Sequence, residues 1–238
     1  MQQAKRQAEA LLSDVDRLIG PGYSAVLYGS VVRGGYVPGR SDVNLLLIVD
    51  QVTPAVLRAL GPSLRQWREV SSAPPLLFTR AEWPRVGDAF PVEITDIRSA
   101  YQVVRGSDPI VGIPVDPEDL RRALERELRG LLLRLRRSYA AFCNDEEALG
   151  HVVRSSTGSA QVLSRALLAL LGKPQPVAAA DAVRAALGAV GSSVGDLSWM
   201  AGHHADPGWR ATAAQVEAHM AAVEDLTLFV DQLQLGDS

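Results

Sequence analysis

The spacing of apolar residues divides the chain into two halves with different predicted structures. In the first half, apolar residues recur every three or four positions in some segments, which indicates helices. In others they form short aliphatic runs or alternate with polar residues, which indicates strands. The elements predicted before residue 100 are helices over 3–19, 54–69 and 80–87 and strands over 24–29, 43–50, 76–79 and 90–97. This half is therefore predicted to be an α/β (α+β) domain, with a short mixed sheet and flanking helices.

After residue 116 the pattern is helical throughout. Asp116 is a good N-cap, Pro117 suits the first helical position, and Glu118 and Asp119 place acids in the first turn. The helices predicted here cover about 117–143, 146–171, 178–190 and 208–234. Such helices, rich in alanine and leucine, predict a C-terminal all-helical bundle. We expect two domains, 1–112 and 117–236.

Composition and charge exclude several classes of protein. The chain has 238 residues and a net charge of −3, which does not suggest a general nucleic-acid binder. One cysteine, Cys143, excludes an internal disulfide framework and a cysteine-based metal cluster. The first twenty residues carry too many charges for a signal peptide, and no apolar run is long enough to cross a membrane. We expect a cytoplasmic protein without a membrane anchor.

Polar residues suited to metal binding stand between residues 28 and 50. Gly29 and Ser30 follow a short apolar run, and Asp42 and Asn44 stand at the start of the next predicted strand. Because side chains alternate between the two faces of a strand, Asp42 and Asn44 are expected to project from the same face. Neighbouring oxygen ligands of this kind can hold magnesium ions, which prefer oxygen ligands and substrate phosphates.

The Gly29–Ser30 turn adds a phosphate-binding feature to the same region. Backbone N–H groups in a glycine turn can converge on a phosphate, and Ser30 stands in that turn. Arg33 and Ser41 could add further contacts. The region therefore predicts a site for a triphosphate and its magnesium ions.

A third acid is normally needed beside two metal ligands, either as a further ligand or as a general base. The strand predicted over 90–97 offers Glu93 and Asp96. Because these residues are three apart, they would face opposite sides of a strand, so only one of them is expected to join the site.

Three segments carry a resemblance to a known family. The pattern Gly-Ser, eleven residues, then Asp-x-Asn before an aliphatic strand resembles the nucleotidyltransferase superfamily of the DNA polymerase beta type. More closely, residues 27–49 (LYGSVVRGGYVPGRSDVNLLLIV) resemble aminoglycoside 3''/9-adenylyltransferases. Residues 91–97 (PVEITDI) resemble the strand that carries the catalytic glutamate of that family, and residues 162–173 (VLSRALLALLGK) resemble its helical domain.

The resemblance implies an N-terminal nucleotidyltransferase domain and transfer of a nucleoside monophosphate from ATP, or another nucleoside triphosphate, to a hydroxyl group. It implies that Asp42, Asn44 and Glu93 hold Mg²⁺ (or Mn²⁺). The residue that matches Glu93 also acts as the base on the acceptor hydroxyl. It further implies that Ser30 binds the triphosphate and that Arg165 reaches the ATP phosphates. The cleft that holds ATP would then lie between the two domains.

Asn44 departs from the family pattern, in which both residues of the pair are aspartates. An amide oxygen can coordinate magnesium, but it lacks the charge and the second oxygen of a carboxylate. Two interpretations therefore stay open. The protein is a weakened nucleotidyltransferase whose acceptor is a small molecule, a protein hydroxyl or a tRNA end, or it is a degenerate domain that binds nucleotide or a partner without turnover.

Two further groups of residues have a functional and a structural interpretation. The arginines predicted on the helix over 117–142 are Arg121, Arg122, Arg126, Arg129, Arg134, Arg136 and Arg137. They could form a basic wall for a triphosphate or an RNA end, but we favour a solvated face paired with glutamates at helical spacing. His203 and His204 suggest a metal site, but a loop is favoured, and His219 is expected to be a satisfied or exposed helical histidine.

Overall fold

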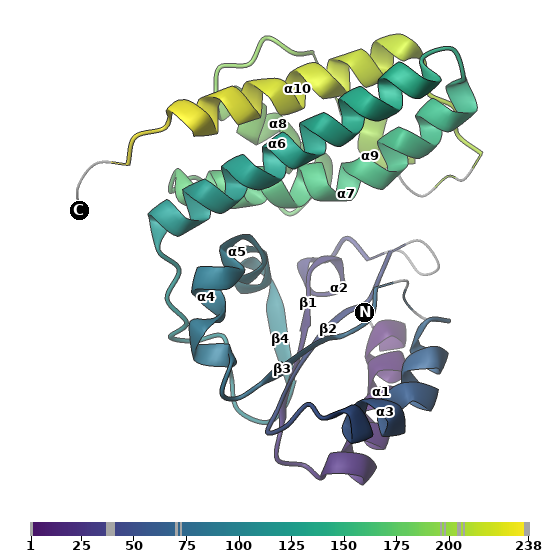
Figure 1. Ribbon diagram of the computed structural model, residues 1–238, viewed down its shortest axis with the longest axis vertical. Coiled ribbons are helices and arrows are strands. Elements are labelled where there is room, and N and C mark those ends of the chain that lie inside the picture. Colours follow the sequence, from purple (N-terminus) through teal and green to yellow (C-terminus); the bar gives the residue numbers. More distant parts are fainter. Residues whose placement is uncertain are drawn as a thin grey trace. The chain divides into compact units, whose positions relative to one another are not determined.

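The computed structural model describes residues 2–36, 41–69, 71, 73–195, 197, 199–203, 206 and 208–235 (Figure 1). The chain forms two compact units, unit 1 (Met1–Val115) and unit 2 (Asp116–Ser238). None of the described helices combines the length and the apolar character that a membrane-spanning segment needs.

Unit 1 is built on a four-stranded mixed sheet with the strand order β3-β2-β1-β4. The strands are β1 (Ser24–Tyr28), β2 (Asn44–Val49), β3 (Leu76–Thr79) and β4 (Tyr101–Arg105). Strand β1 pairs antiparallel with both β2 and β4, whereas β2 and β3 are parallel. The register places Tyr28 between Asn44 and Tyr101. The predicted α/β fold with a short mixed sheet is therefore confirmed.

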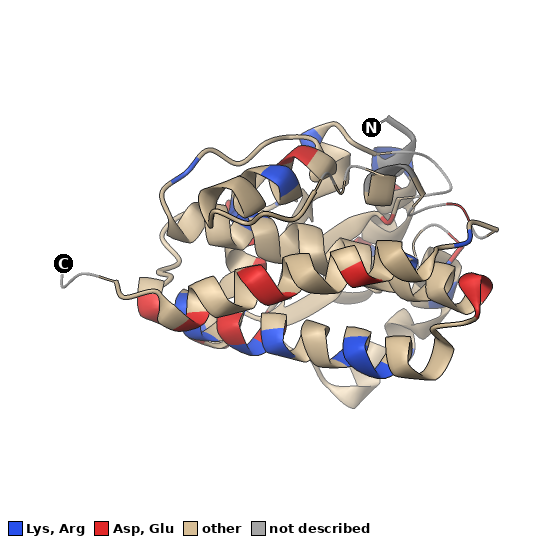
Figure 2. Cartoon of the chain, turned by 90° about the horizontal axis from the view of Figure 1, so that it is seen from above, with Lys and Arg blue, Asp and Glu red and all other residues tan. Residues whose placement is uncertain are grey.

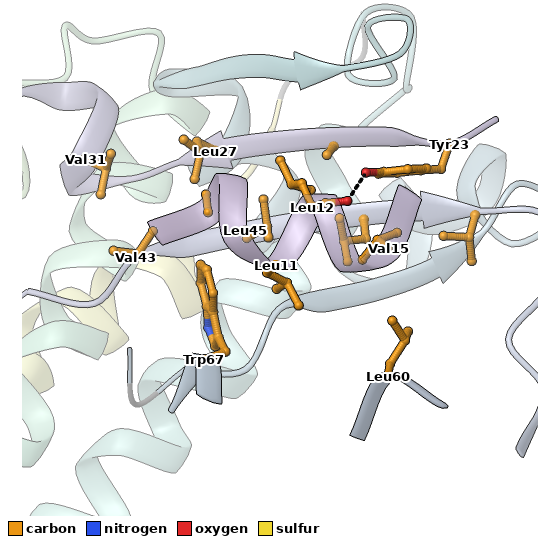
Figure 3. Close-up of a cluster of buried hydrophobic side chains, with 14 residues drawn as sticks. Leu11, Leu12, Val15, Tyr23, Leu27, Val31, Val43, Leu45, Leu60 and Trp67 are labelled. Carbon is orange, nitrogen blue, oxygen red and sulfur yellow. Dashed lines mark hydrogen bonds between the residues drawn. The ribbon is translucent and has the colours of Figure 1, made fainter. Parts of the chain in front are cut away.

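Helices α1 (Gln2–Ile19) and α3 (Pro54–Trp67) pack on one face of this sheet. Leu27 and Leu45 of the sheet are buried with Leu12 of α1 and Trp67 of α3 (Figure 3). The hydroxyl of Tyr23 donates to the carbonyl of Leu12 at 3.2 Å, which fixes the start of β1 against α1 (Figure 3).

The opposite face of the sheet is covered by α5 (Pro91–Ser99), which follows the short helices η1 (Trp83–Arg85) and α4 (Val86–Ala89). Ile94 and Ile97 of α5 are buried against Val26 and Leu46 of the sheet. The strand predicted over 90–97 was therefore wrong, because this segment is helical and the fourth strand begins only at Tyr101.

The misassigned segment has weak local preferences. Its β-branched residues and its alternation favour a strand, but Pro91 fits the first position of a helix, where a missing N–H costs nothing. Packing of its apolar side onto the sheet then decides the outcome, because tertiary contacts override weak propensities.

Unit 2 is all helical, as predicted. Its helices are α6 (Pro117–Phe142), α7 (Glu146–Leu170), α8 (Ala179–Ala189), α9 (Trp199–His203) and α10 (Ala213–Gln232). The side chain of Asp116 accepts from the backbone N–H groups of Glu118 and Asp119, which confirms the predicted cap of α6. Helix α6 packs against both α7 and α10, and charged residues are interspersed along the helices (Figure 2).

Two expectations for unit 2 need correction. Helix α10 begins at Ala213 rather than near residue 208, because Thr212 and Gln215 form a capping box there. His203 was expected in a loop, but it ends α9 and its ring stacks on Trp209 at 4.7 Å. His204 lies outside the described residues.

A histidine lies inside unit 2. His219 of α10 is 1% exposed, and its Nε2 lies 2.9 Å from the hydroxyl oxygen of Ser156 in α7. The Ser156 hydroxyl donates to the carbonyl of Val153, so it is free to accept from the His219 N–H. Burial lowers the pKa of His219 from its ordinary 6.5 to about 4, because the charged ring would lose its hydration.

This burial predicts a pH-dependent stability. Between pH 6.5 and 4 the unfolded chain protonates His219 and the folded chain does not, so the free energy of unfolding falls as the pH decreases through that window. The expected loss is about 3 kcal/mol. Urea unfolding of the natural protein and of His219→Gln, measured at pH 7 and pH 4, tests this, since the variant lacks the titrating ring. Equal losses in both proteins would contradict the prediction.

Candidate functional site

The Gly29–Ser30 turn is held in a conformation that requires glycine. Gly29 has φ 74°, in the left-handed region. A β-carbon on Gly29 would stand 2.8 Å from the Nδ2 atom of Asn44, so a larger residue would also displace the end of the Asn44 side chain. The N–H of Gly29 donates to the carbonyl of Ala100 at 3.0 Å. This N–H therefore serves the fold, and Ser30 opens a one-turn helix, α2 (Ser30–Arg33), where the sequence predicted only a turn.

Asp42 and Asn44 lie at the start of β2. Asn44 is the first residue of the strand, and Val43 is fully buried on the same side as Leu45, so the alternation of faces extends back to Asp42. The Asp42 side chain is exposed, and its Oδ1 accepts from the hydroxyl of Ser71 at 3.2 Å. The same hydroxyl accepts from the backbone N–H of Val43. Ser71 thus positions Asp42, a contact that sequence reasoning missed.

The two acids of α5 lie on one side of that helix. Residues three apart on a helix are neighbours, whereas on the expected strand they would have faced opposite ways. Glu93 is exposed in the first turn, and Asp96 is buried. Both acids lie near Tyr28. Burial, with further contributions from the charges of Asp96 and Glu93, raises the pKa of the Tyr28 hydroxyl above its ordinary value.

Tyr28 places these acids relative to the metal-ligand candidates. Residues directly opposite each other in an antiparallel pair share a face, so Tyr28 and Asn44 lie on the same face of the sheet. This is the face that α5 covers. Glu93 and Asn44 therefore lie on the same side of the sheet, and the alternation through Val43 places Asp42 there as well.

Arg33 joins the turn to α5. Its Nη2 lies 2.9 Å from the Oδ1 of Asp96, and both side chains are only 11% exposed. The same nitrogen donates to the hydroxyl of Ser99 at 2.6 Å. The guanidinium of Arg33 thus binds the end of α5, and the further contact with phosphate that the sequence suggested stays a prediction. Ser41 is half-buried next to residues that the structure does not describe.

Arg165 lies in α7 of unit 2 and is 5% exposed. Its Nη2 donates to the carbonyl of Val177 at 3.3 Å, in the segment that follows α7. This bond holds the guanidinium within the helical unit, and the predicted contact with a triphosphate stays a prediction.

The candidate metal ligands include two carboxylates and one amide, where three carboxylates would be expected. In the described part of the chain, no three His, Cys, Asp or Glu side chains gather where they could hold a metal ion. Asp42, Asn44 and Glu93 offer hard oxygen atoms of the kind that magnesium prefers, but with one negative charge fewer than three acids would give. The residues fit such a cation in chemical type and fall short in charge.

Comparison with known proteins gives a match by fold. No protein-family model matches the sequence, and no curated protein matches it. Six chains of solved structure do match. One is spectinomycin adenyltransferase AAD(9) from Enterococcus faecialis, crystallised with ATP and spectinomycin, which superimposes with a TM-score of 0.60 at 12% sequence identity. The match covers 96% of this chain and 99% of that one. The chain therefore has the nucleotidyltransferase fold that its motifs predicted.

Proposed function

We propose that the protein is a metal-dependent nucleotidyltransferase that transfers a nucleoside monophosphate from ATP, or another nucleoside triphosphate, to a hydroxyl group. This proposal rests on one observation, that the candidate metal ligands and the glycine turn lie on the same side of the sheet in unit 1. There the Gly29–Ser30 turn lies against Asn44, with Asp42 two residues away and Glu93 on the helix that covers the same face.

The residues of unit 1 divide the work in this proposal. Asp42, Asn44 and Glu93 would supply oxygen ligands to Mg²⁺ or Mn²⁺, and the bound cation would neutralise charge on the triphosphate. The exposed Glu93 carboxylate can take the proton from the acceptor hydroxyl. Ser30 would contact the phosphates at the turn. Arg165 is proposed as a further phosphate ligand on the resemblance alone.

The acceptor is proposed as a hydroxyl of a small molecule, a protein or a tRNA end. The matched adenyltransferase was crystallised with spectinomycin, which makes aminoglycoside-type hydroxyls the first acceptors to assay. A screen should then extend to protein and tRNA hydroxyls.

A second candidate is a nucleotide-binding protein without turnover, and Asn44 favours it. Asn44 places an uncharged amide at the start of β2, where the resemblance implies an acidic ligand. Replacing a carboxylate by an amide lowers the charge that holds the cation.

Asn44→Asp tests the choice between these candidates. The substitution keeps the size of the side chain and restores the charge. If the natural protein is an enzyme, transfer of label from an α-³²P-labelled triphosphate should rise about tenfold or more. Asn44→Ala, which removes the oxygen, is the matched control and should lose activity. A natural protein that binds ATP without turnover and gains it only as Asn44→Asp would establish the second candidate.

Glu93→Gln tests the proposed base. The amide keeps the shape of Glu93 and cannot take a proton, so kcat should fall about 10²-fold or more. Asp88→Asn is the control, because Asp88 is an exposed acid on the neighbouring α4. Pyrophosphate release with magnesium or manganese gives the rates. If Glu93→Gln retained the rate of the natural protein, the assignment of the base would be wrong.

A further inference from the structure

The arginines of α6 fall into two groups by their ion pairs. Four of them pair with acids of α6 or α10: Arg121, Arg122, Arg129 and Arg136. Arg129 reaches Asp231 at 2.7 Å, and Arg136 reaches Glu224 at 2.6 Å. The predicted pairing with glutamates at helical spacing is thus confirmed for Arg121, Arg122 and Arg129, whereas Arg136 pairs with another helix. Within the described residues, Arg126, Arg134 and Arg137 form no ion pair.

The three unpaired arginines share a second face of α6. Positions 126, 134 and 137 are separated by eight and three residues, which brings them to the same side of a helix. All three side chains are exposed. This side of α6 therefore carries three guanidinium groups that form no ion pair with a described carboxylate.

Arg134 and Arg137 line a groove between α6 and α7 with a volume of about 370 Å³. Serine hydroxyls stand on both of its walls, from Ser138 on α6 and from Ser155, Ser156 and Ser159 on α7. The groove has no acidic lining residue, and Arg126 does not line it. It lies wholly within unit 2, between two helices that pack on each other.

The chemistry of the groove fits an oxyanion. Guanidinium groups stay charged at every physiological pH and match the oxygen atoms of a phosphate. The hydroxyls of Ser155 and Ser156 already donate to backbone carbonyls. Those of Ser138 and Ser159 make no hydrogen bond within the described chain, and a hydroxyl can donate to an anion. Phe142, which is 44% exposed, gives the groove an apolar part beside these polar groups.

We propose that this groove is a binding site for a phosphate monoester, held through its phosphoryl group by Arg134 and Arg137. A phosphate monoester carries a charge between about −1.5 and −2 at neutral pH, which balances two guanidinium groups. Ser138 and Ser159 supply hydroxyl donors for its oxygens, and its organic part rests on the exposed ring of Phe142. The proposal does not rest on the nucleotidyltransferase activity, because none of these residues belongs to unit 1.

Isothermal titration of the full-length protein with phenyl phosphate tests the site. The natural protein should bind one equivalent, and the double variant Arg134→Gln/Arg137→Gln should bind at least tenfold more weakly. Arg126→Gln is the matched control, since it removes an unpaired arginine from the same helix face outside the groove, and its affinity should match that of the natural protein. Benzoate, with a single charge, should bind more weakly than phenyl phosphate.

The same titrations define the results that overturn the proposal. Absence of phenyl phosphate binding to the natural protein would refute it. An equal loss in Arg126→Gln would show general attraction to a basic helix rather than a site, and so would tight binding of a short RNA that depends on all three arginines. ATP affinity is expected to be the same in the double variant. A parallel fall in ATP affinity would show that the groove belongs to a nucleotide site, and would refute the proposal of a separate phosphate-monoester site. Unchanged thermal unfolding of the variants confirms that the loss is not one of folding.

Discussion

The ion pair between Arg33 and Asp96 is the constraint on which the arrangement of unit 1 depends. It joins the one-turn helix after Ser30 to the helix that carries Glu93, and both of its side chains are largely buried. The bond from the Gly29 N–H to the Ala100 carbonyl holds the other end of the same turn. Loss of one partner would leave a buried charge unpaired, which typically costs about 3–5 kcal/mol. The turn and Glu93 are therefore positioned as one piece.

Asn44, the first residue of β2, lies next to this turn, and the proposed chemistry of the site depends on its amide. Its amide nitrogen lies so close to Gly29 that no other residue fits the turn without displacement. The space available and the charge needed for a cation thus favour different residues at position 44. The fold accepts a side chain of this size, while tight binding of a divalent cation favours a carboxylate. An amide at this position is therefore compatible with the fold, and it favours nucleotide binding over metal-dependent turnover.

Local signals in the sequence were enough for most elements but not for the contacts that build the site. The cap of α6 and the strand at β2 follow from short patterns, and both were predicted correctly. The segment of α5 was misassigned because its β-branched alternation resembles a strand, and packing on the sheet decides its structure. The contact of Arg33 with Asp96 was missed because the two residues are 63 apart in the sequence and no local pattern reveals such a pair. The contact of Ser71 with Asp42 was missed for the same reason.

A double-mutant cycle on Arg33 and Asp96, with the affinity for ATP as the readout, tests the central claim most directly. Arg33→Gln, Asp96→Asn and the double variant would be titrated with ATP in the presence of magnesium. If the pair positions the turn, each single variant should bind ATP more weakly than the natural protein. The double variant should bind ATP as well as the weaker-binding single variant, which gives a coupling energy between the two residues of about 1 kcal/mol or more. If Arg33 instead contacted the phosphates directly, Asp96→Asn would leave ATP affinity unchanged or raise it, and that result would contradict the account.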